Sequence, residues 1–456
     1  MKHQFTLRTF FSRHLTPARI FVLSFAGFIL AGALVLWLPS SASGDTLRFV
    51  DALFTAASAV CVTGLVTIDI GQTLSLTGQI ITLTLFQVGG LGIITFSILL
   101  FALMGRRVSF KGREITQATF LHSPRKDIYS IVKRVLLYTL IIEFFGTLFL
   151  FVQFIQEYPL FQALYVAIFH AVSAFNNAGF SLFSDSLMRY QSNSLVNVTI
   201  MLLIILGGIG FIVQQEVVAK IRGTQKKLSL HTKIVLIATV LLILLGAACF
   251  YFMEMNNVLR GETIKTALLS SFFQSITSRT AGFNTVDIGI LSNSTLLLMM
   301  ALMFIGASPG SAGGGVKTTS FAILLLLFVN RIKGRENVNV ANRTIPRELV
   351  DRTISIVFAS AIVIGIVSAV LLLASGTSGA PLASRYQFIE YIFEAFSAFG
   401  TVGLSMGATP KLNDIQKYAI IFMMFIGRVG PLTLAFAWYS RRRKGITYAE
   451  ESVMVG

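Results

Sequence analysis

Four tripeptides that end in glycine carry residue types able to bind a cation without any charged side chain. They are Val62-Thr63-Gly64, Asn177-Ala178-Gly179, Thr280-Ala281-Gly282 and Thr401-Val402-Gly403. Backbone carbonyls can replace the water around a dehydrated ion. Turning successive carbonyls to one side requires backbone with positive φ, which glycine adopts without strain. We therefore take these residues as candidate cation ligands that act through their main-chain oxygens.

Each tripeptide follows a short amphipathic run, and the four glycines lie roughly one hundred residues apart, as expected of four diverged repeats. One such tripeptide is expected by chance, but four at equivalent places are not expected by chance. The predicted repeats span residues 1–104, 105–218, 219–330 and 331–456, the last with a cytoplasmic tail. Their predicted pore loops are 51–65, 165–180, 266–283 and 388–404.

The composition places these repeats in a membrane. Hydrophobic residues make up 54% of the 456 residues and charged residues only 12%, whereas soluble domains carry about 25% charged residues. The net charge of +17 comes from basic residues in loops between long apolar segments, so we predict no binding of nucleic acid. The two cysteines have no spacing typical of a disulfide framework or a metal site.

Apolar stretches long enough to cross a bilayer define the expected architecture. Seven are continuous, and an eighth is interrupted between 305 and 321; they are 20–38, 79–104, 135–155, 195–216, 234–253, 295–329, 354–374 and 418–438. We expect an all-α polytopic membrane protein of eight transmembrane helices. Its four span–pore loop–span repeats would surround a pseudo-fourfold central pore, where non-helical backbone is tolerated.

The basic residues predict the orientation. Five segments hold 27 of the 37 lysines and arginines, namely 1–19, 104–134, 219–233, 330–352 and 441–456. The positive-inside rule then places both termini in the cytoplasm of a cell inner (plasma) membrane. The first apolar stretch, 20–38, is longer than the apolar region of a cleaved signal peptide, so we expect it to remain as a span.

The interruption in the span 295–329 is built from small residues, and we predict that it gates the pore. The proposed gate residues are Gly306, Ser308, Pro309, Gly310, Gly313, Gly314, Gly315, Lys317 and, from the last span, Arg428. Small residues also cluster at 86–92, 204–210 and 426–431. Those clusters fit either close helix packing or room for an ion-filled cavity, and the two interpretations are compatible.

Charged residues inside apolar segments are costly and so mark functional or structural contacts. Arg428 is interpreted as a charge facing the pore, or else as the partner of Glu143 or Glu216. Arg279 is expected to brace the third tripeptide. Lys317 either anchors the interrupting loop, through an acid or main-chain carbonyls, or extends to the cytoplasmic edge of the membrane.

With these motifs in place, the chain resembles the Trk/Ktr/HKT superfamily of potassium transporters, and within it a KtrB-type membrane subunit, over nearly its whole length. The resemblance rests on the four tripeptide glycines, on Thr401-Val402-Gly403, which matches a potassium-channel filter, on the glycine-rich interruption and on Arg428. It implies potassium uptake, with potassium at the filter, no cofactor in this chain, and sodium dependence left open. It also implies a homodimer docked on a cytoplasmic ring of nucleotide-binding regulatory subunits. Pro309 departs from the family pattern and bears on the motion of the gate.

The sequence argues against two other functional classes. Gly315 and Lys317 do not form the GxxxxGK[ST] pattern of a phosphate-binding loop, and the sequence has no HExxH or GxSxG motif, so we do not expect an enzyme. A receptor or assembly subunit with a vestigial pore remains the alternative, against which the four glycines argue. Measurement of ion flux separates the two.

Overall fold

The computed structural model describes residues 17–91, 128–376 and 381–438, and within these ranges the chain is mostly helical. The elements are α2 (Pro17–Leu36), η1 (Pro39–Ser41), α3 (Phe49–Cys61), α4 (Ile70–Thr73), α5 (Leu76–Gly90), α8 (Ile128–Phe154), α9 (Leu160–Phe175), η2 (Met188–Tyr190), α10 (Ser194–Gly208), α11 (Phe211–Ile221), α12 (Leu230–Glu254), α13 (Ile264–Thr277), η3 (Ile288–Ile290), α14 (Asn293–Phe304), α15 (Thr318–Ile332), β1 (Asn339–Val340), β2 (Arg343–Thr344), α16 (Arg347–Ala374), α17 (Pro381–Gly400), η4 (Thr409–Lys411), α18 (Asp414–Val429) and α19 (Pro431–Trp438). The two strands form one short antiparallel hairpin. The predicted tail and most of the basic segment 104–134 lie outside the described residues.

One succession of helices recurs along the chain: a first helix, a second helix that ends in a candidate tripeptide, and a third helix. The third helices α5, α10, α14 and α18 begin in the same way. In each, a Ser or Asn side chain at the N-cap accepts a hydrogen bond from a first-turn backbone N–H; the caps are Ser75, Asn193, Ser292 and Asn413. Such caps satisfy backbone donors that a helix leaves unpaired at its start.

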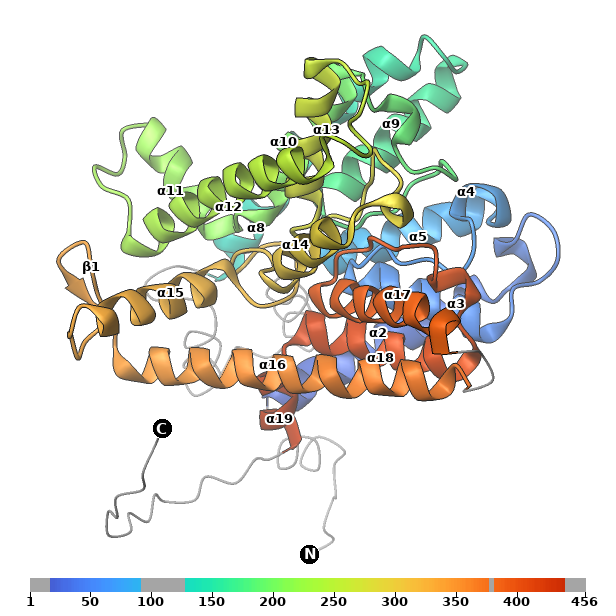
Figure 1. Cartoon of the computed structure of the whole chain (residues 1–456). Helices are drawn as coiled ribbons and strands as arrows, with labels where there is room; N and C mark the ends of the chain where they lie inside the picture. Colours follow the sequence, from blue (N-terminus) through green and yellow to red (C-terminus); the bar gives the residue numbers. More distant parts are fainter. Residues whose placement is uncertain (1–16, 92–127, 377–380, 439–456) are drawn as a thin grey trace, which may run out of the picture.

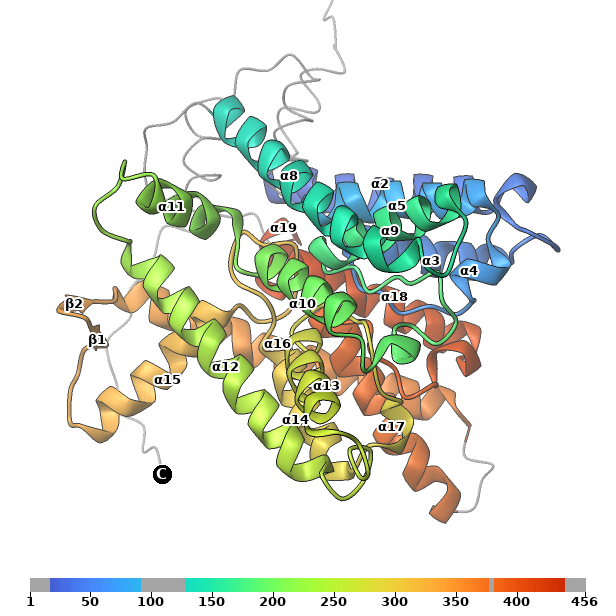
Figure 2. The same cartoon turned by 90° about the horizontal axis from the view of Figure 1, so that it is seen from above.

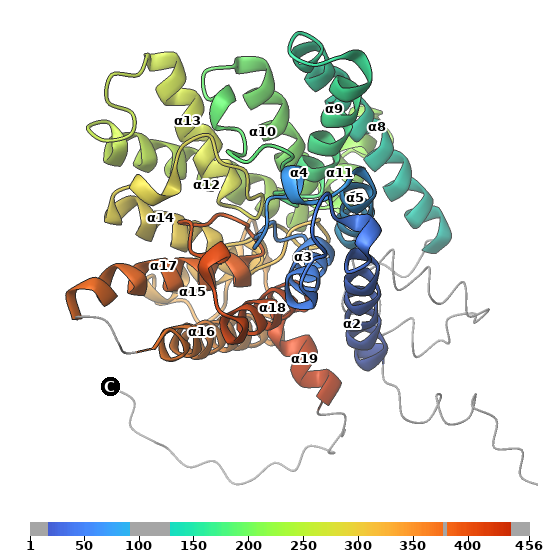
Figure 3. The ribbon, with the colours of Figure 1, turned by 90° about the vertical axis from the view of Figure 1, so that its right-hand side faces the viewer.

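The groups of helices follow one another around the middle of the molecule in sequence order, as Figure 3 shows. Helix α5 packs on α9, α10 on α13, and α14 on α17. Helix α18 packs on α3, so the last group returns to the first. The four groups of helices therefore form a closed arrangement.

Long helices lie at the periphery. Helix α16 runs along one edge of the molecule in Figure 1, and α8 and α12 follow other edges in Figure 2. They expose large apolar side chains, such as Leu140 and Phe144 on α8, Leu245 on α12 and Phe358 on α16. Helix α3, in contrast, is buried almost throughout. An apolar outer surface of this extent is typical of contact with lipid.

Three described helices are long and apolar enough to cross a membrane, within Lys133–Phe154, Leu230–Glu254 and Arg347–Ala374. A fourth candidate is the pair α10 and α11, which is bent by 103°. The prediction of continuous spans at 195–216 and 418–438 is wrong. Both break at glycines with positive φ, Gly210 at 92° and Gly430 at 89°, which end a straight helix. The span predicted at 79–104 extends past the described residues, and the count of eight spans stays a prediction.

A buried ion pair joins α3 to α18 across the closure of the arrangement. Lys417 Nζ lies 2.7 Å from Asp51 Oδ1, and both residues are buried. Asp51 also accepts a hydrogen bond from Arg48 at 2.9 Å. Removing one partner of a buried pair costs about 3–5 kcal/mol, and we expect no more than that here, because Asp51 would keep only the exposed Arg48 as a cation.

We predict that Lys417→Met lowers the thermal unfolding midpoint of the detergent-solubilised protein. Asp185→Asn is the matched control, since it breaks the more exposed Arg189–Asp185 pair and should cost about 1 kcal/mol or less. The double variant Asp51→Asn/Lys417→Met should recover part of the loss, because no uncompensated charge remains. A midpoint for Lys417→Met as high as that of Asp185→Asn would contradict the assignment.

Candidate functional site

The four tripeptides share one backbone conformation. Each glycine has positive φ: Gly64 at 88°, Gly179 at 70°, Gly282 at 85° and Gly403 at 96°. Sequence reasoning missed a second left-handed residue, two positions earlier, that is never glycine: Val62 at 56°, Asn177 at 55°, Thr280 at 74° and Thr401 at 50°. Such residues cost about 1–3 kcal/mol each and persist only where surrounding contacts fix them.

Ser and Thr side chains of the preceding helix supply those contacts. In the first and fourth segments the glycine N–H donates to a serine, Gly64 to Ser58 Oγ at 3.0 Å and Gly403 to Ser397 Oγ at 3.1 Å. In the second and third segments a hydroxyl donates to the carbonyl after the glycine, Ser173 to Phe180 O at 2.8 Å and Thr277 to Phe283 O at 2.6 Å. The available sequence signal is a Ser or Thr five or six residues before each glycine.

The four glycines face one another's segments in a closed ring. A Cβ atom on Gly64 would lie 2.5 Å from Ala178 O, one on Gly179 2.7 Å from Ala281 O, one on Gly282 2.3 Å from Val402 O, and one on Gly403 2.2 Å from Thr63 O. Each glycine thus meets the carbonyl oxygen that precedes the next glycine. No side chain fits at these positions, and four segments far apart in sequence converge with their carbonyl groups.

Glycines of the third helices serve close packing. A Cβ on Gly89 of α5 would lie 2.2 Å from Val60 O, and one on Gly427 of α18 would lie 2.0 Å from Phe399 O. In α10 the corresponding distance, from Gly207 to Phe175 O, is 1.8 Å. These helices therefore touch the backbone of the helices that carry the tripeptides, as the packing interpretation of the small-residue clusters expects.

The interrupting loop lies between α14 and α15 and is bound to two neighbouring third helices. Backbone N–H groups of Ser308 and Ala312 donate to Gly208 O at 3.0 Å and Gly207 O at 3.2 Å. The N–H of Gly315 donates to Gly427 O at 3.3 Å.

The other residues of the predicted gate take part in the same packing. Gly310 O accepts from Phe211 N at 3.0 Å, and Pro309 O lies 2.5 Å from where a Cβ on Gly210 would be. Within the loop, Gly306 N donates to Val316 O at 2.8 Å.

The loop also contacts two of the tripeptides. The N–H of Gly314 donates to Thr401 Oγ1 at 2.9 Å. A Cβ on Gly313 would lie 2.1 Å from Thr280 Oγ1. Since Thr280 and Thr401 are the left-handed residues of their segments, the loop lies directly against the start of both tripeptides.

Two cations, the half-buried Lys317 and the buried Arg428, hold the loop through main-chain oxygens. Lys317 Nζ donates to Gly313 O at 2.8 Å, which agrees with an anchor on carbonyls. Arg428 is buried and donates to Ala312 O in the loop and to Gly89 O in α5. Among the ion pairs of the described residues, none joins Arg428 to an acid, so neither alternative partner is bound to it.

The two acids and the remaining arginine have other contacts. Glu143 accepts from Gln87 and Asn176, and Glu216 accepts from Thr232 Oγ1 at 2.7 Å. The Arg279 guanidinium donates to Thr239 O of α12 at 3.5 Å, consistent with a brace.

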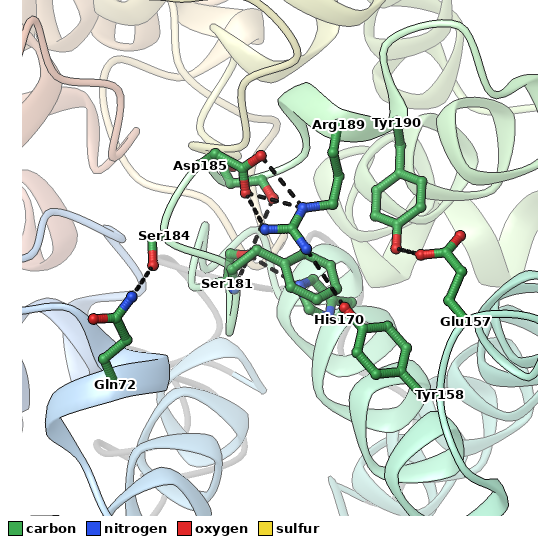
Figure 4. Close-up of polar contacts among 11 residues, drawn as sticks. Gln72, Glu157, Tyr158, His170, Ser181, Ser184, Asp185, Arg189 and Tyr190 are labelled. Carbon is green, nitrogen blue, oxygen red and sulfur yellow. Dashed lines mark hydrogen bonds and ion pairs between the residues drawn. The ribbon is translucent and has the colours of Figure 1, made fainter.

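A cluster that sequence reasoning missed fixes the chain after the second tripeptide (Figure 4). His170 Nε2 lies 3.0 Å from Ser181 Oγ, and its ring stacks on Phe183 with centroids 4.6 Å apart. The Arg189 guanidinium lies over the Phe183 ring, 4.6 Å from its centroid. It also forms an ion pair with Asp185 at 2.8 Å. A lone histidine in an apolar run gives no sequence signal, because its partner Ser181 is recognisable only in the fold.

Comparison with known proteins finds related transporters. The profile of the TrkH family, described as "Cation transport protein", matches residues 9–441. The Ktr system potassium uptake protein B of Bacillus subtilis (strain 168) is 36% identical over 443 residues, covering 97% of both chains. The potassium/sodium uptake protein NtpJ of Enterococcus hirae is 38% identical over 449 residues, covering 97% of this chain and 98% of NtpJ.

A solved structure shows the same fold. The potassium transporter TrkH from Vibrio parahaemolyticus superposes with a TM-score of 0.73 over 95% of this chain and 86% of that chain. The two sequences are 20% identical over the match, so the likeness concerns the arrangement of helices rather than individual side chains.

The bond between the loop and the fourth tripeptide yields a prediction. Thr401→Val keeps the side-chain shape but leaves the buried Gly314 N–H without its acceptor, at a cost of about 1–3 kcal/mol. We expect a lower thermal unfolding midpoint than for Thr84→Val, which removes an exposed hydroxyl from helix α5. Equal midpoints for the two variants would rule out the contact.

Proposed function

Because the chain belongs to the TrkH family of cation transport proteins and is a potassium uptake transporter of the Ktr/Trk type, we propose that potassium crosses its centre through the four tripeptides. Carbonyl oxygens of residues 62–64, 177–179, 280–282 and 401–403 replace the water of the ion. No covalent chemistry is needed.

The ring of glycines is the observation that carries this proposal. Thr63, Ala178, Ala281 and Val402 each present a carbonyl oxygen to a neighbouring glycine, and no side chain intervenes. Oxygens from four segments at one level suit a dehydrated monovalent cation, which needs several neutral ligands. The helices before the tripeptides end there, so the negative ends of their dipoles favour a cation.

The succession of helices supports a four-repeat pore. In this proposal α2, α8, α12 and α16 are the first spans of four repeats, and α5, α10, α14–α15 and α18 are the second spans, interrupted or bent at glycines. The protein is a multi-pass protein of the plasma membrane. We place both termini in the cytoplasm on the distribution of basic residues.

The interrupting loop is the proposed gate. Residues Gly313 and Gly314 lie against the tripeptides, and Arg428 and Lys317 bind the loop backbone. An opened state requires the loop to leave these contacts. In this proposal, a cytoplasmic ring of nucleotide-binding subunits controls that step in a homodimer of this chain, and Pro309 limits how far the loop moves.

The direct test is rubidium uptake into liposomes that contain the purified protein, with a potassium gradient as driving force. The proposal expects uptake that potassium competes away, measured with and without sodium because a relative is named for both ions. Correctly inserted protein that passes no rubidium under either condition would favour the vestigial-pore alternative.

Serine substitution of the glycines tests the filter. Each serine adds a Cβ at positive φ, with strain of about 1–3 kcal/mol, and collides with a backbone carbonyl. We expect KM for rubidium to rise about tenfold for each 1.4 kcal/mol lost, or sodium to be admitted. The effects should be largest at Gly282 and Gly403, where the contacts are shortest, at 2.3 and 2.2 Å.

The control is Gly365→Ser in the middle of α16, where an added Cβ meets no atom within 4 Å. Rubidium uptake with sodium competition is measured at matched expression. If all four tripeptide variants kept the KM and sodium discrimination of Gly365→Ser, the tripeptides would not be the filter.

Arg428→Gln tests the electrostatic part of the gate. At an effective dielectric constant of about 20, a unit charge about 8 Å from the ion path costs about 2 kcal/mol, or roughly thirtyfold in ion occupancy. The substitution should therefore raise the maximal uptake rate, by up to about thirtyfold, whereas Arg260→Gln in an exposed loop should not. A rate that stays at the wild-type value in stable, inserted protein would show that Arg428 is a purely structural anchor.

A further inference from the structure

Glu143, near the middle of the peripheral helix α8, is a buried acid that the proposed filter and gate do not use. Its side chain is 6% exposed. Oε2 accepts a hydrogen bond from Gln87 Nε2 at 3.2 Å, and Oε1 accepts one from Asn176 Nδ2 at 3.1 Å. Both donors are amides, one on α5 and one at the end of α9. Because an acid inside a membrane is costly to bury, we expect one with such specific partners to have a function.

Asn176 connects this acid to the second tripeptide. It is the C-cap of α9 and directly precedes the left-handed Asn177. Its Nδ2 lies within hydrogen-bond distance of three oxygens, Glu143 Oε1, Gln87 Oε1 at 2.6 Å and Val172 O at 2.8 Å. Three acceptors around one NH₂ group hold the side chain in a single orientation.

The residue that follows Asn176 in the chain makes a separate contact with the third tripeptide. Asn177 Nδ2 donates to Thr280 Oγ1 at 3.1 Å, and both residues are left-handed. The orientation of Asn176 therefore bears on two of the four segments. Glu143 acts on them without touching the ion path.

The last turn of α5 connects the acid to the gate. Gln87 donates to Glu143, and Gly89, two residues later, accepts from Arg428. Arg428 in turn donates to Ala312 O of the interrupting loop. The carboxyl of Glu143 and the guanidinium of Arg428 thus bind the same helical turn, which ends at Gly90.

We propose that Glu143 is a positioning residue that fixes the conformation of the second tripeptide and couples it, through the last turn of α5, to Arg428 and the gate loop. When Arg428 leaves Gly89 O, the last turn of α5 loses one of its contacts and can move. Gln87 moves with that turn, and Asn176 then loses one of its hydrogen-bond partners. Opening of the loop and ion affinity of the filter are then linked rather than independent. This inference rests on the proposed function of the tripeptides.

A buried acid that only stabilises the fold has a different environment, which Glu254 illustrates. Its carboxylate accepts from Ser292 N at 2.9 Å, Ser292 Oγ at 2.8 Å, Thr295 Oγ1 at 2.5 Å and Asn257 Nδ2 at 2.7 Å. These donors tie the end of α12 to the start of α14 and include no tripeptide residue. Glu254→Gln is therefore the matched control for Glu143→Gln.

The experiment measures KM and maximal rate of rubidium uptake, with sodium competition, for the wild type, the two glutamate variants, Arg428→Gln and the double variant Glu143→Gln/Arg428→Gln. Glu143→Gln keeps one acceptor oxygen but turns an amide donor toward the amide of Gln87 or of Asn176, so one of the two bonds is lost and we expect KM to rise about tenfold. Glu254→Gln should leave KM and sodium competition unchanged. In the Arg428→Gln background, Glu143→Gln should raise KM by only about threefold or less, because the last turn of α5 has already lost its bond to Arg428.

A wild-type KM in Glu143→Gln would overturn the positioning role, and effects that multiply fully in the double variant would overturn the coupling. Gln87→Leu repeats the test if Glu143→Gln does not insert, since it removes the bond to Glu143 Oε2 and should raise KM in the same direction. Hydrogen exchange gives a reading that does not depend on transport. Amides of 176–180 and 306–315 should exchange faster in Glu143→Gln than in Glu254→Gln, and equal exchange would reject the inference while leaving the proposed function standing.

Discussion

The close approach of four glycines to the carbonyl groups of the neighbouring tripeptides is the constraint on which the rest of this structure depends. At 2.2–2.7 Å from a neighbouring oxygen there is no room for a Cβ atom at Gly64, Gly179, Gly282 or Gly403. The helices that lead to these residues must end there, and the chain must turn through a left-handed residue two positions before each glycine. The hydroxyl and backbone bonds from Ser58, Ser173, Thr277 and Ser397 hold that strained conformation in place.

The third helices pack closely against the helices that lead to the tripeptides. Gly89, Gly207 and Gly427 touch the carbonyls of the last helical turns before the tripeptides. Where α14 ends, the chain becomes the loop that fills the space under the third and fourth segments. In the part of the chain that the structure describes, Arg428 and Lys317 form no ion pair with an acid. They bind carbonyl oxygens of the loop and of α5 instead. Hydrogen bonds of this kind are compatible with the movement that we propose for the loop.

Much of the site could be predicted from the sequence, because its residues are unusual for a membrane span. A simple membrane-spanning helix does not have this composition: four glycines between apolar stretches, a run of small residues and an arginine among apolar neighbours. The breaks at Gly210 and Gly430 were not predicted, since apolar residues continue on both sides and hydropathy does not register backbone direction. The left-handed Val62 and Thr401 were missed because β-branched residues rarely adopt positive φ. Glu143 contacts Gln87 and Asn176, which only the packing of α5, α8 and α9 brings close to it.

The most direct measurement is an experimental structure of the inserted protein with rubidium in place of potassium, recorded so that the anomalous signal of the ion is visible. The interpretation predicts an ion at the centre of the four segments, surrounded by carbonyl oxygens of residues such as Thr63, Ala178, Ala281 and Val402. The peak should disappear when sodium replaces rubidium. A rubidium ion bound elsewhere, with this ring empty in protein that transports rubidium, would contradict it.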